Sequence, residues 1–289
     1  VGLLKDRVSV YEAKLVRHGG GQLRVWNDIF LDGRLALSAR FRGMPLSAIP
    51  GLSGLEVPVS GRVSGDLKLT GSVSDPRAGG RVSLASTKVR GAALGAGWLR
   101  LKPGSDTIRL EGALFNNHVR LDGYVLMRPQ HSLHLTVDIK RFPVHRVAPE
   151  LAKVGDVRGL VSGRIGLDLD EKRGLRWVNA RLSAVDFSLR YRPRGQRSYR
   201  VLRLKNADDL VANYNGKRIE VVNARLVSQV IGHNKAPQAR FMLRGHLAPT
   251  ASLLKVRGDV PLELAEFFLA RKVKRISGRL AADMTIRGP

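Results

Sequence analysis

Strict alternation of apolar and polar residues constrains the fold of this chain more than any other feature. In the stretch 60–72, Val63, Leu67 and Leu69 occupy odd positions. The even positions carry polar or charged residues: Arg62, Ser64, Asp66, Lys68 and Thr70. Successive side chains of a β-strand point to opposite faces, so this spacing predicts a strand with one apolar and one polar face.

The same period of two recurs along the chain, in residues 35–42, 108–112, 133–140 and 164–170. Turn sequences separate such runs, namely Ser74-Asp75-Pro76, Asn116-Asn117, Pro193-Arg194-Gly195 and Asn215-Gly216. Short alternating runs between turns are typical of half-buried antiparallel strands. We therefore predict an all-β fold, an elongated and curled antiparallel sheet with a few short amphipathic helices.

Three segments with helical spacing each begin with an apolar residue followed by proline, which suits a first helical turn. They lie near residues 44–52, 142–154 and 260–273. A Ser-Gly-Arg phrase and a strand pattern follow each of them, at 60–62, 162–164 and 277–279. This order indicates an internal repeat of roughly 100 residues. The predicted organisation is the end of a repeat in 1–59, repeat units in 60–161 and 162–276, and a truncated repeat in 277–289.

The net charge and the hydropathy of the chain limit the classes of partner that it is expected to bind. The chain has a net charge of +26, and arginine supplies 36 of its 50 basic residues. Such a charge favours acidic partners, or it reflects arginine as the common polar residue of solvated strands. No run approaches the ~20 apolar residues of a membrane span. The chain begins without Met and ends inside a repeat, so we expect a longer protein with an anchor outside this segment.

The predicted strands carry more apolar surface than three short helices can cover. Two sheets packed face to face as a sandwich would cover it. A groove filled by lipid would cover it as well. Left open to water, the apolar stripe would exceed the few hundred Å² that soluble proteins usually expose. The sequence therefore permits a sandwich or a lipid-filled groove.

The phrase in residues 60–86 resembles the repeat of TamB/AsmA-like proteins, which are long β-rich proteins of the Gram-negative envelope. The matching residues are Gly61, Val63, Gly65, Leu67, Leu69, Gly71, Val73, Pro76, Gly80, Val82 and Leu84. The second copy matches at Gly163, Ile165, Leu167 and Leu169, then departs where "DEKRG" replaces the proline step. The third copy, from Gly278 to Pro289, is cut short.

This resemblance implies a sheet that is polar outside and apolar inside and conducts phospholipid acyl chains between inner and outer membranes. It also implies a periplasmic location with an inner-membrane tether, and an outer-membrane barrel partner of the TamA type. Assembly of outer-membrane β-barrel proteins by strand pairing is the alternative function. The expected lining consists of Val63, Leu67, Leu69, Leu84, Leu110, Leu133, Leu135, Val137, Ile139, Ile165, Leu167 and Leu169.

Sequence motifs for catalysis or metal binding are weak. The His-Gly-Gly-Gly sequence within 17–22 occurs in some esterase oxyanion holes, but the required nucleophile turn is missing. His131 and His134 should point to opposite faces of a strand, and Asp168 with Asp170 fits solvated strand residues better than a cation site. We expect no catalysis, no metal and no cofactor.

An arginine-rich stretch, 190–203, surrounds Tyr191 and Tyr199. Arginine interleaved with aromatic residues is also found in proteins that bind single-stranded nucleic acid. The central Pro-Arg-Gly instead predicts a long hairpin tip that contacts anionic headgroups or glycans or remains without a partner. Its candidate contacts are Arg190, Arg192, Arg194, Arg197 and Arg200. A basic nucleic-acid-binding β-protein is the second alternative function, and it does not explain the repeated one-sided strands.

Overall fold

The computed structural model describes residues 2–16, 20–49, 58–127, 131–148, 156–172, 174–191, 200–231, 238–249, 251–261 and 278–288. Within these ranges the chain forms eighteen β-strands and two single turns of 3-10 helix. The strands pair with antiparallel neighbours. The predicted all-β antiparallel fold is confirmed.

The chain divides into two compact units. Unit 1 comprises Val1–Val137 with Asp168–Gly174, and unit 2 comprises Asp138–Leu167 with Leu175–Pro289. Strands β10 (Ser132–Pro143) and β11 (Asp156–Asp170) contribute residues to both units. These units do not begin at the Ser-Gly-Arg phrases, and the repeat boundaries stay a prediction.

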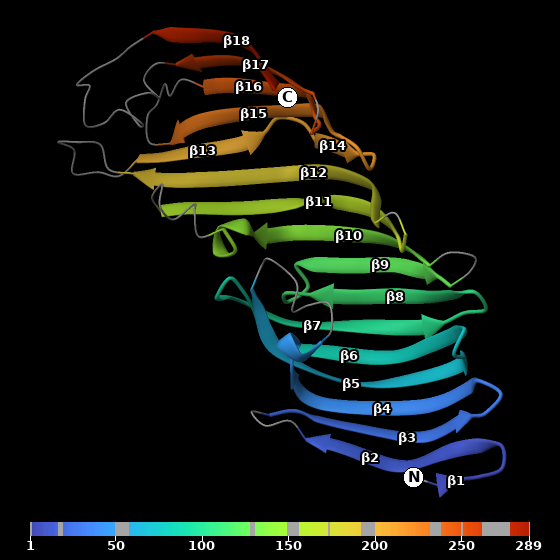
Figure 1. Cartoon of the computed structure of the whole chain (residues 1–289). Coiled ribbons are helices and arrows are strands. Elements are labelled where there is room, and N and C mark those ends of the chain that lie inside the picture. Colours follow the sequence, from blue (N-terminus) through green and yellow to red (C-terminus); the bar gives the residue numbers. More distant parts are fainter. Residues whose placement is uncertain are drawn as a thin grey trace. The chain divides into compact units, whose positions relative to one another are not determined.

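Unit 1 is a meander in which each strand hydrogen-bonds to the next one in the chain (Figure 1). Its strands are β1 (Gly2–Leu3), β2 (Arg7–Val16), β3 (Gln22–Phe30), β4 (Arg34–Pro45), β5 (Val59–Ser72), β6 (Asp75–Val89), β7 (Ala92–Pro103), β8 (Thr107–Leu114) and β9 (Val119–Leu126). The β8–β9 turn contains the predicted Asn116 and Asn117, with φ of 56° and 65°. Asn tolerates this left-handed region better than most residues, so the turn is as tight as predicted.

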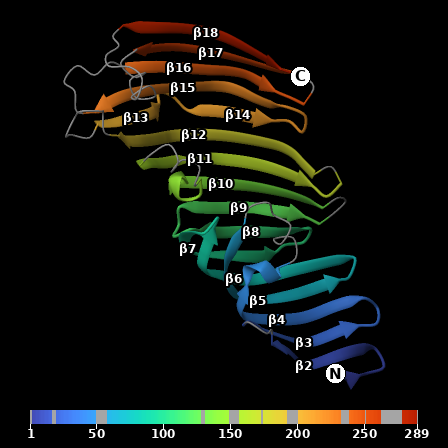
Figure 2. The same cartoon turned by 60° about the vertical axis from the view of Figure 1, so that its left-hand side comes forward.

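Unit 2 contains one departure from a simple meander. Its further strands are β12 (Gly174–Tyr191), β13 (Arg200–Asn206), β14 (Leu210–Tyr214), β15 (Ile219–Ile231), β16 (Gln238–Leu247), β17 (Ser252–Pro261) and β18 (Arg279–Gly288). The short strands β13 and β14 both pair with β12 on one side and with β15 on the other. They lie end to end and together fill one strand position (Figure 2).

The helical segments are shorter than the sequence pattern suggests in the parts that can be described. A 3-10 turn, η1 (Leu46–Ala48), follows β4, and a second, η2 (Val144–Arg146), follows β10. Pro45 and Pro143 end the preceding strands and act as N-caps of these turns. The first residues of the predicted helices, 44–45, 142–143 and 260–261, belong instead to the ends of strands β4, β10 and β17. Residues 50–52, 149–154 and 262–273 lie outside the described residues.

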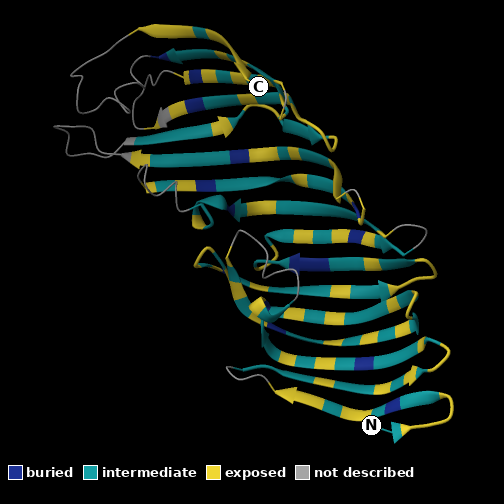
Figure 3. Cartoon of the chain, viewed as in Figure 1, coloured by how far each residue is buried: buried dark blue, intermediate teal, exposed yellow. Residues whose placement is uncertain are grey.

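Few of the described residues are fully buried. The buried hydrophobic residues among them are Leu46, Val63, Leu94, Ala113, Val185 and Ala239. Along β5 and β16 the colours alternate between less and more exposed positions (Figure 3). Neither unit has a second sheet or a helical layer among its described residues, which explains the small core.

Candidate functional site: the apolar face of each unit

Strand register assigns every paired side chain of unit 1 to a face. Directly opposite residues of an antiparallel pair point to the same face. Leu37 faces Leu69, Val63 faces Leu84, and the series continues strand by strand to β9. The resulting apolar face of unit 1 includes Leu35, Leu37, Val63, Leu67, Leu69, Val82, Leu84, Leu99, Leu101, Ile108, Leu110, Leu121 and Val125.

Glycines on this face make room for the large side chains of the neighbouring strand. A Cβ added to Gly80 would stand 3.0 Å from Cδ2 of Leu67 and would collide with the carbonyl oxygen of Asp66. A Cβ on Gly123 would stand 3.1 Å from Cδ1 of Leu135. Leucine side chains therefore lie flat over glycines of the neighbouring strand. This contact half-buries the leucines although the sheet is a single layer. Gly65, Gly112, Gly163 and Gly245 have equally close cross-strand neighbours.

The predicted lining residues of β10 and β11 also fall on apolar positions. Leu135 lies over Gly123 in unit 1, so Leu133 and Val137 share its face by the period of two. In unit 2, Arg164 donates a hydrogen bond from Nε to Asp138 at 2.6 Å on the polar face. The odd-numbered Ile139, Ile165 and Leu167 therefore point to the opposite face. Leu169, in unit 1, is 38% exposed.

The apolar face of unit 2 follows from the same reasoning. Its residues include Leu182, Leu189, Leu202, Leu204, Leu226, Phe241, Leu243, Leu254, Val256, Val260, Met284 and Ile286. Ala239 is fully buried, and Leu202, Phe241 and Val260 pack against it. Leu202 belongs to β13, which is separated from β16 by β15, so side chains cross over the small Ser228 between them. Among the described residues, this face packs against itself and not against a second layer.

The opposite side of each unit, here called the polar face, carries ion pairs between neighbouring strands. In unit 1, Nζ of Lys102 donates to Glu111 at 2.8 Å, and this bond lowers the pKa of Glu111 below its ordinary value against the opposing effect of burial. In unit 2, Arg203 donates two hydrogen bonds to Asp186. These bonds are the main reason why the pKa of Asp186 is lowered. The polar face is therefore organised for contact with water.

Arginine also stacks on aromatic rings of unit 1. The guanidinium of Arg34 lies 4.6 Å from the ring centre of Phe30, and that of Arg81 lies 5.6 Å from the ring centre of Trp98. Such contacts are favourable by about 0.5–1 kcal/mol at exposed sites. They hold large aromatic residues on a polar surface.

His131 and His134 each contact a carboxylate, and Asp170 accepts a hydrogen bond from the backbone N–H of Lys172. His131 contacts Glu171 at 2.6 Å, and His134 contacts Asp168 at 2.7 Å while its ring stacks on Tyr124. No group of three or more potential metal ligands occurs in the described ranges. In the His-Gly-Gly-Gly motif, 18–21, the first two residues lie outside the described residues, and Gly20 and Gly21 have φ of 105° and 102°.

The arginine-rich stretch connects two paired strands, as predicted. Tyr191 of β12 is the backbone partner of Arg200 of β13, and Arg190 is exposed near the end of β12. Arg192, Arg194 and Arg197 lie outside the described residues, so their contact with an anionic surface stays a prediction.

The chain matches no protein-family model, no curated protein and no solved structure in comparisons of its sequence and fold. No described helix has the length and apolar character needed to cross a membrane.

Sequence reasoning missed two features of these faces. It assigned glycine to the turns between strands, whereas several glycines lie inside paired strands beneath leucines. It also missed a hollow on the polar face of unit 2 whose arginines come from three strands. No sequence signal brings these arginines together, because their alignment depends on the register of β15, β16 and β17.

Proposed function

We propose that the chain is a segment of an envelope protein that carries phospholipid acyl chains along its apolar face, without catalysis. The observation that supports this most is that each unit is a one-layer sheet in which the alternating apolar side chains are only half-buried. The resemblance to TamB/AsmA-like repeats supplies the cargo and the place, a periplasmic path between inner and outer membranes. A barrel partner of the TamA type and an anchor elsewhere in the protein belong to the same proposal.

Energetics favour a lining of this kind for lipid. Each methylene moved into water costs about 0.8 kcal/mol, so a two-tailed lipid with about thirty methylenes costs on the order of 24 kcal/mol to extract bare. Strands of ten to fifteen residues, such as β5 and β6, extend roughly 33–50 Å. A face of that width, lined by Leu, Val and Ile, shelters acyl chains while headgroups stay in water.

Site-specific photo-crosslinking to lipid tests this proposal. A photo-reactive amino acid replaces Leu135 on the apolar face or Thr136, its neighbour on the polar face. We expect lipid adducts in cells expressing the whole protein from position 135 and few from position 136, and native mass spectrometry of the purified chain should detect phospholipid. Equal labelling from both positions would mean that the apolar face is covered by protein.

A charged residue introduced separately at each of these two positions tests transport. Leu135→Asp in the full-length protein should abolish complementation of a transport-deficient strain, because an ion in an apolar path is poorly solvated. Thr136→Asp is the matched control and should complement. Circular dichroism of both variants separates lost transport from lost folding. Full activity with Leu135→Asp in a folded protein contradicts the proposal.

Assembly of outer-membrane β-barrel proteins by strand pairing stays the alternative function. Crosslinks from the chain to an unfolded barrel protein, with no lipid adducts at position 135, would favour this function over transport.

A further inference from the structure

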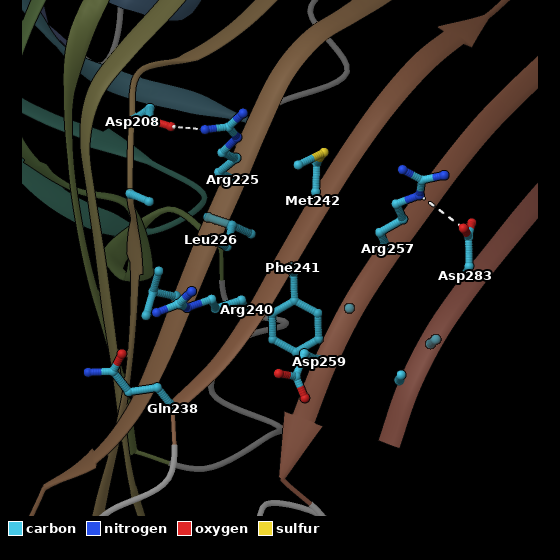
Figure 4. Close-up of a pocket in the computed structure, with 15 residues that line it drawn as sticks. Asp208, Arg225, Leu226, Gln238, Arg240, Phe241, Met242, Arg257, Asp259 and Asp283 are labelled. Atoms are coloured by element: carbon cyan, nitrogen blue, oxygen red, sulfur yellow. Dashed lines mark hydrogen bonds and ion pairs between the residues drawn. The ribbon is translucent and has the colours of Figure 1, made fainter. Parts of the chain in front are cut away.

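A hollow of about 800 Å³ opens among strands β15, β16, β17 and β18 of unit 2 (Figure 4). Its size falls in the range of small-molecule sites. The polar-face residues that border it are Asp208, Arg225, Val227, Gln238, Arg240, Met242, Arg257, Asp259, Ala281 and Asp283. Leu226 and Phe241 border it too, although the register assigns them to the apolar face.

Three arginines lie near Met242 in this hollow: Arg225 and Arg257 flank it, and Arg240 lies one position further along its face of β16. Met242 of β16 stands directly opposite Arg225 of β15 and Arg257 of β17. Arg240 lies two residues before Met242 on the same face of β16. Because strands are about 4.8 Å apart and alternate residues about 7 Å apart, all three Cα atoms lie within about 10 Å of one another. Their long side chains can therefore reach one bound group above Met242.

Aspartates orient two of these arginines without using all of their donors. Nη1 of Arg225 donates to Asp208 at 3.2 Å, and Nε of Arg257 donates to Asp283 at 2.9 Å (Figure 4). A guanidinium has five N–H donors, so each arginine keeps donors for a ligand. Oriented arginines of this kind lose less freedom when they bind.

The third arginine has no such partner. The side chain of Arg240 makes no hydrogen bond or ion pair with the described residues. It stands opposite Asp259, which accepts hydrogen bonds from Arg279. The bond from Arg279 is the main reason why the pKa of Asp259 is lowered, and the charge of Arg240 adds to the effect. Asp259 thus stays ionised with Arg279, and no described residue takes up the side-chain donors of Arg240.

The next pair of opposed residues along β16 and β17 adds positive charge to the surroundings of the hollow. The floor of the hollow is apolar. Arg244 and Lys255 stand directly opposite each other across β16 and β17, an arrangement that is unfavourable unless an anion lies nearby. Val227, opposite Arg240, and Met242 form apolar floor positions, and Met242 is 37% exposed. The hollow therefore combines arginine donors with an apolar surface.

We propose that this hollow binds the phosphate group of an amphiphilic ligand, with Arg225, Arg240 and Arg257 on the phosphate and Met242 with Val227 on the apolar part. Planar guanidinium groups match phosphate oxygens two at a time, which a point charge does not. The site lies on the polar face, so it does not depend on lipid transport along the apolar face. A membrane lipid headgroup and a free phosphate ester share this chemistry.

Calorimetric titration of the whole chain with hexyl phosphate and with inorganic phosphate tests the site. Hexyl phosphate should bind about tenfold more tightly, since burial of two methylenes on the floor accounts for that ratio. Arg240→Gln should weaken hexyl phosphate binding about tenfold or more. Arg218→Gln removes the same charge from an exposed position of unit 2 outside the hollow and should bind like the wild type.

A second variant separates the apolar floor from the charges. Met242→Ser should lower the affinity for hexyl phosphate toward that for inorganic phosphate and leave the latter unchanged. No saturable binding of hexyl phosphate at millimolar concentration would overturn the proposal. Equal affinity of the wild type and Arg240→Gln, with both folded by circular dichroism, would overturn it too.

Vesicles identify the source of the phosphate. If the ligand is a lipid headgroup, vesicles containing phosphatidic acid should bind the wild type, and Arg240→Gln should lose most of this binding while Arg218→Gln keeps it. If the ligand is a free ester, hexyl phosphate should bind while the vesicles bind the wild type and Arg240→Gln alike. Both results support the site and assign its ligand.

Discussion

The apolar and polar faces of each unit are built by the same strands and are stabilised in different ways. On the apolar face, side chains such as Leu67 and Leu135 lie over glycines of the next strand. On the polar face, long side chains form ion pairs across strands, for example Arg40 with Asp66 at 2.5 Å, and remain largely open to water. One face depends on close packing, and the other on contacts that solvent weakens.

This difference indicates where the folding free energy arises. Exposed ion pairs contribute about 0–1 kcal/mol each, because water solvates the separate ions almost as well. Burial of an apolar side chain contributes about 1.5–3 kcal/mol. The apolar face should therefore tolerate few substitutions and the polar face many. The predictions below compare matched changes on the two faces.

The largest expected effect comes from a charge on the apolar face. Val63 is 2% exposed, whereas Thr70 on the polar face of the same strand β5 is exposed and stands opposite Arg77. Val63→Asp should lower the free energy of unfolding by about 4 kcal/mol or more. Thr70→Asp should change it by less than about 0.5 kcal/mol. Urea unfolding followed by circular dichroism measures both, and similar stabilities would show that Val63 is open to water in solution.

A smaller effect should follow from filling the space under a leucine. A Cβ at Gly123 would collide with the carbonyl oxygen of His134, a backbone atom that cannot move away easily. Gly123→Ala should therefore destabilise the fold by about 2–3 kcal/mol. At Gly288 the nearest neighbour of a Cβ is Cβ of Ser252 at 3.8 Å, so Gly288→Ala should be neutral or slightly stabilising. Equal effects at the two positions would refute the role given to glycine on the apolar face.

The fold class, most strand positions and the composition of the faces could be predicted from the sequence. Alternation decides the face of a side chain, and in a one-layer sheet no packing partner overrides this local preference. The turns at 115–118 and 215–218 follow from Asn and Gly, whose local backbone preferences are strong. The turn after β5 falls on 73–74, one residue earlier than predicted, because Asp75 and Pro76 already belong to β6. The hairpin between β12 and β13 was predictable for the same reason.

Cross-strand neighbours could not be predicted, because they depend on register. The register between β15 and β16 shifts between Val221 and Ala224, and one slipped residue moves a side chain to the other face. The arrangement of Arg225, Met242 and Arg257 in one row depends on that shift. The end-to-end placement of β13 and β14 was equally hidden, since each segment alone is an ordinary short strand.

The smallest expected effect concerns an ion pair of the polar face and its dependence on pH. Hydrogen bonds from Arg203 lower the pKa of Asp186 below its ordinary value of 3.8, against the opposing effect of burial. A carboxyl group with a lowered pKa in the folded state stabilises the protein above its unfolded pKa. The contribution is complete above about pH 5 and is lost as the pH falls below 3.8 through the lowered folded pKa.

Asp186→Asn should therefore destabilise the chain at pH 7 by about 0.5–1 kcal/mol, a value kept small because both side chains are about one-third exposed. The difference between wild type and variant should shrink toward zero as the pH falls below 3.8, because protonation of the wild-type Asp186 removes the same charge. Asp156, which lies 3.9 Å from Arg158 at an exposed position of the same unit, provides the control. Asp156→Asn should change the stability by less than about 0.3 kcal/mol at either pH. Urea unfolding at pH 7 and pH 3 measures these differences, and a cost of Asp186→Asn that is as large at pH 3 as at pH 7 would mean that the ion pair with Arg203 is not its cause.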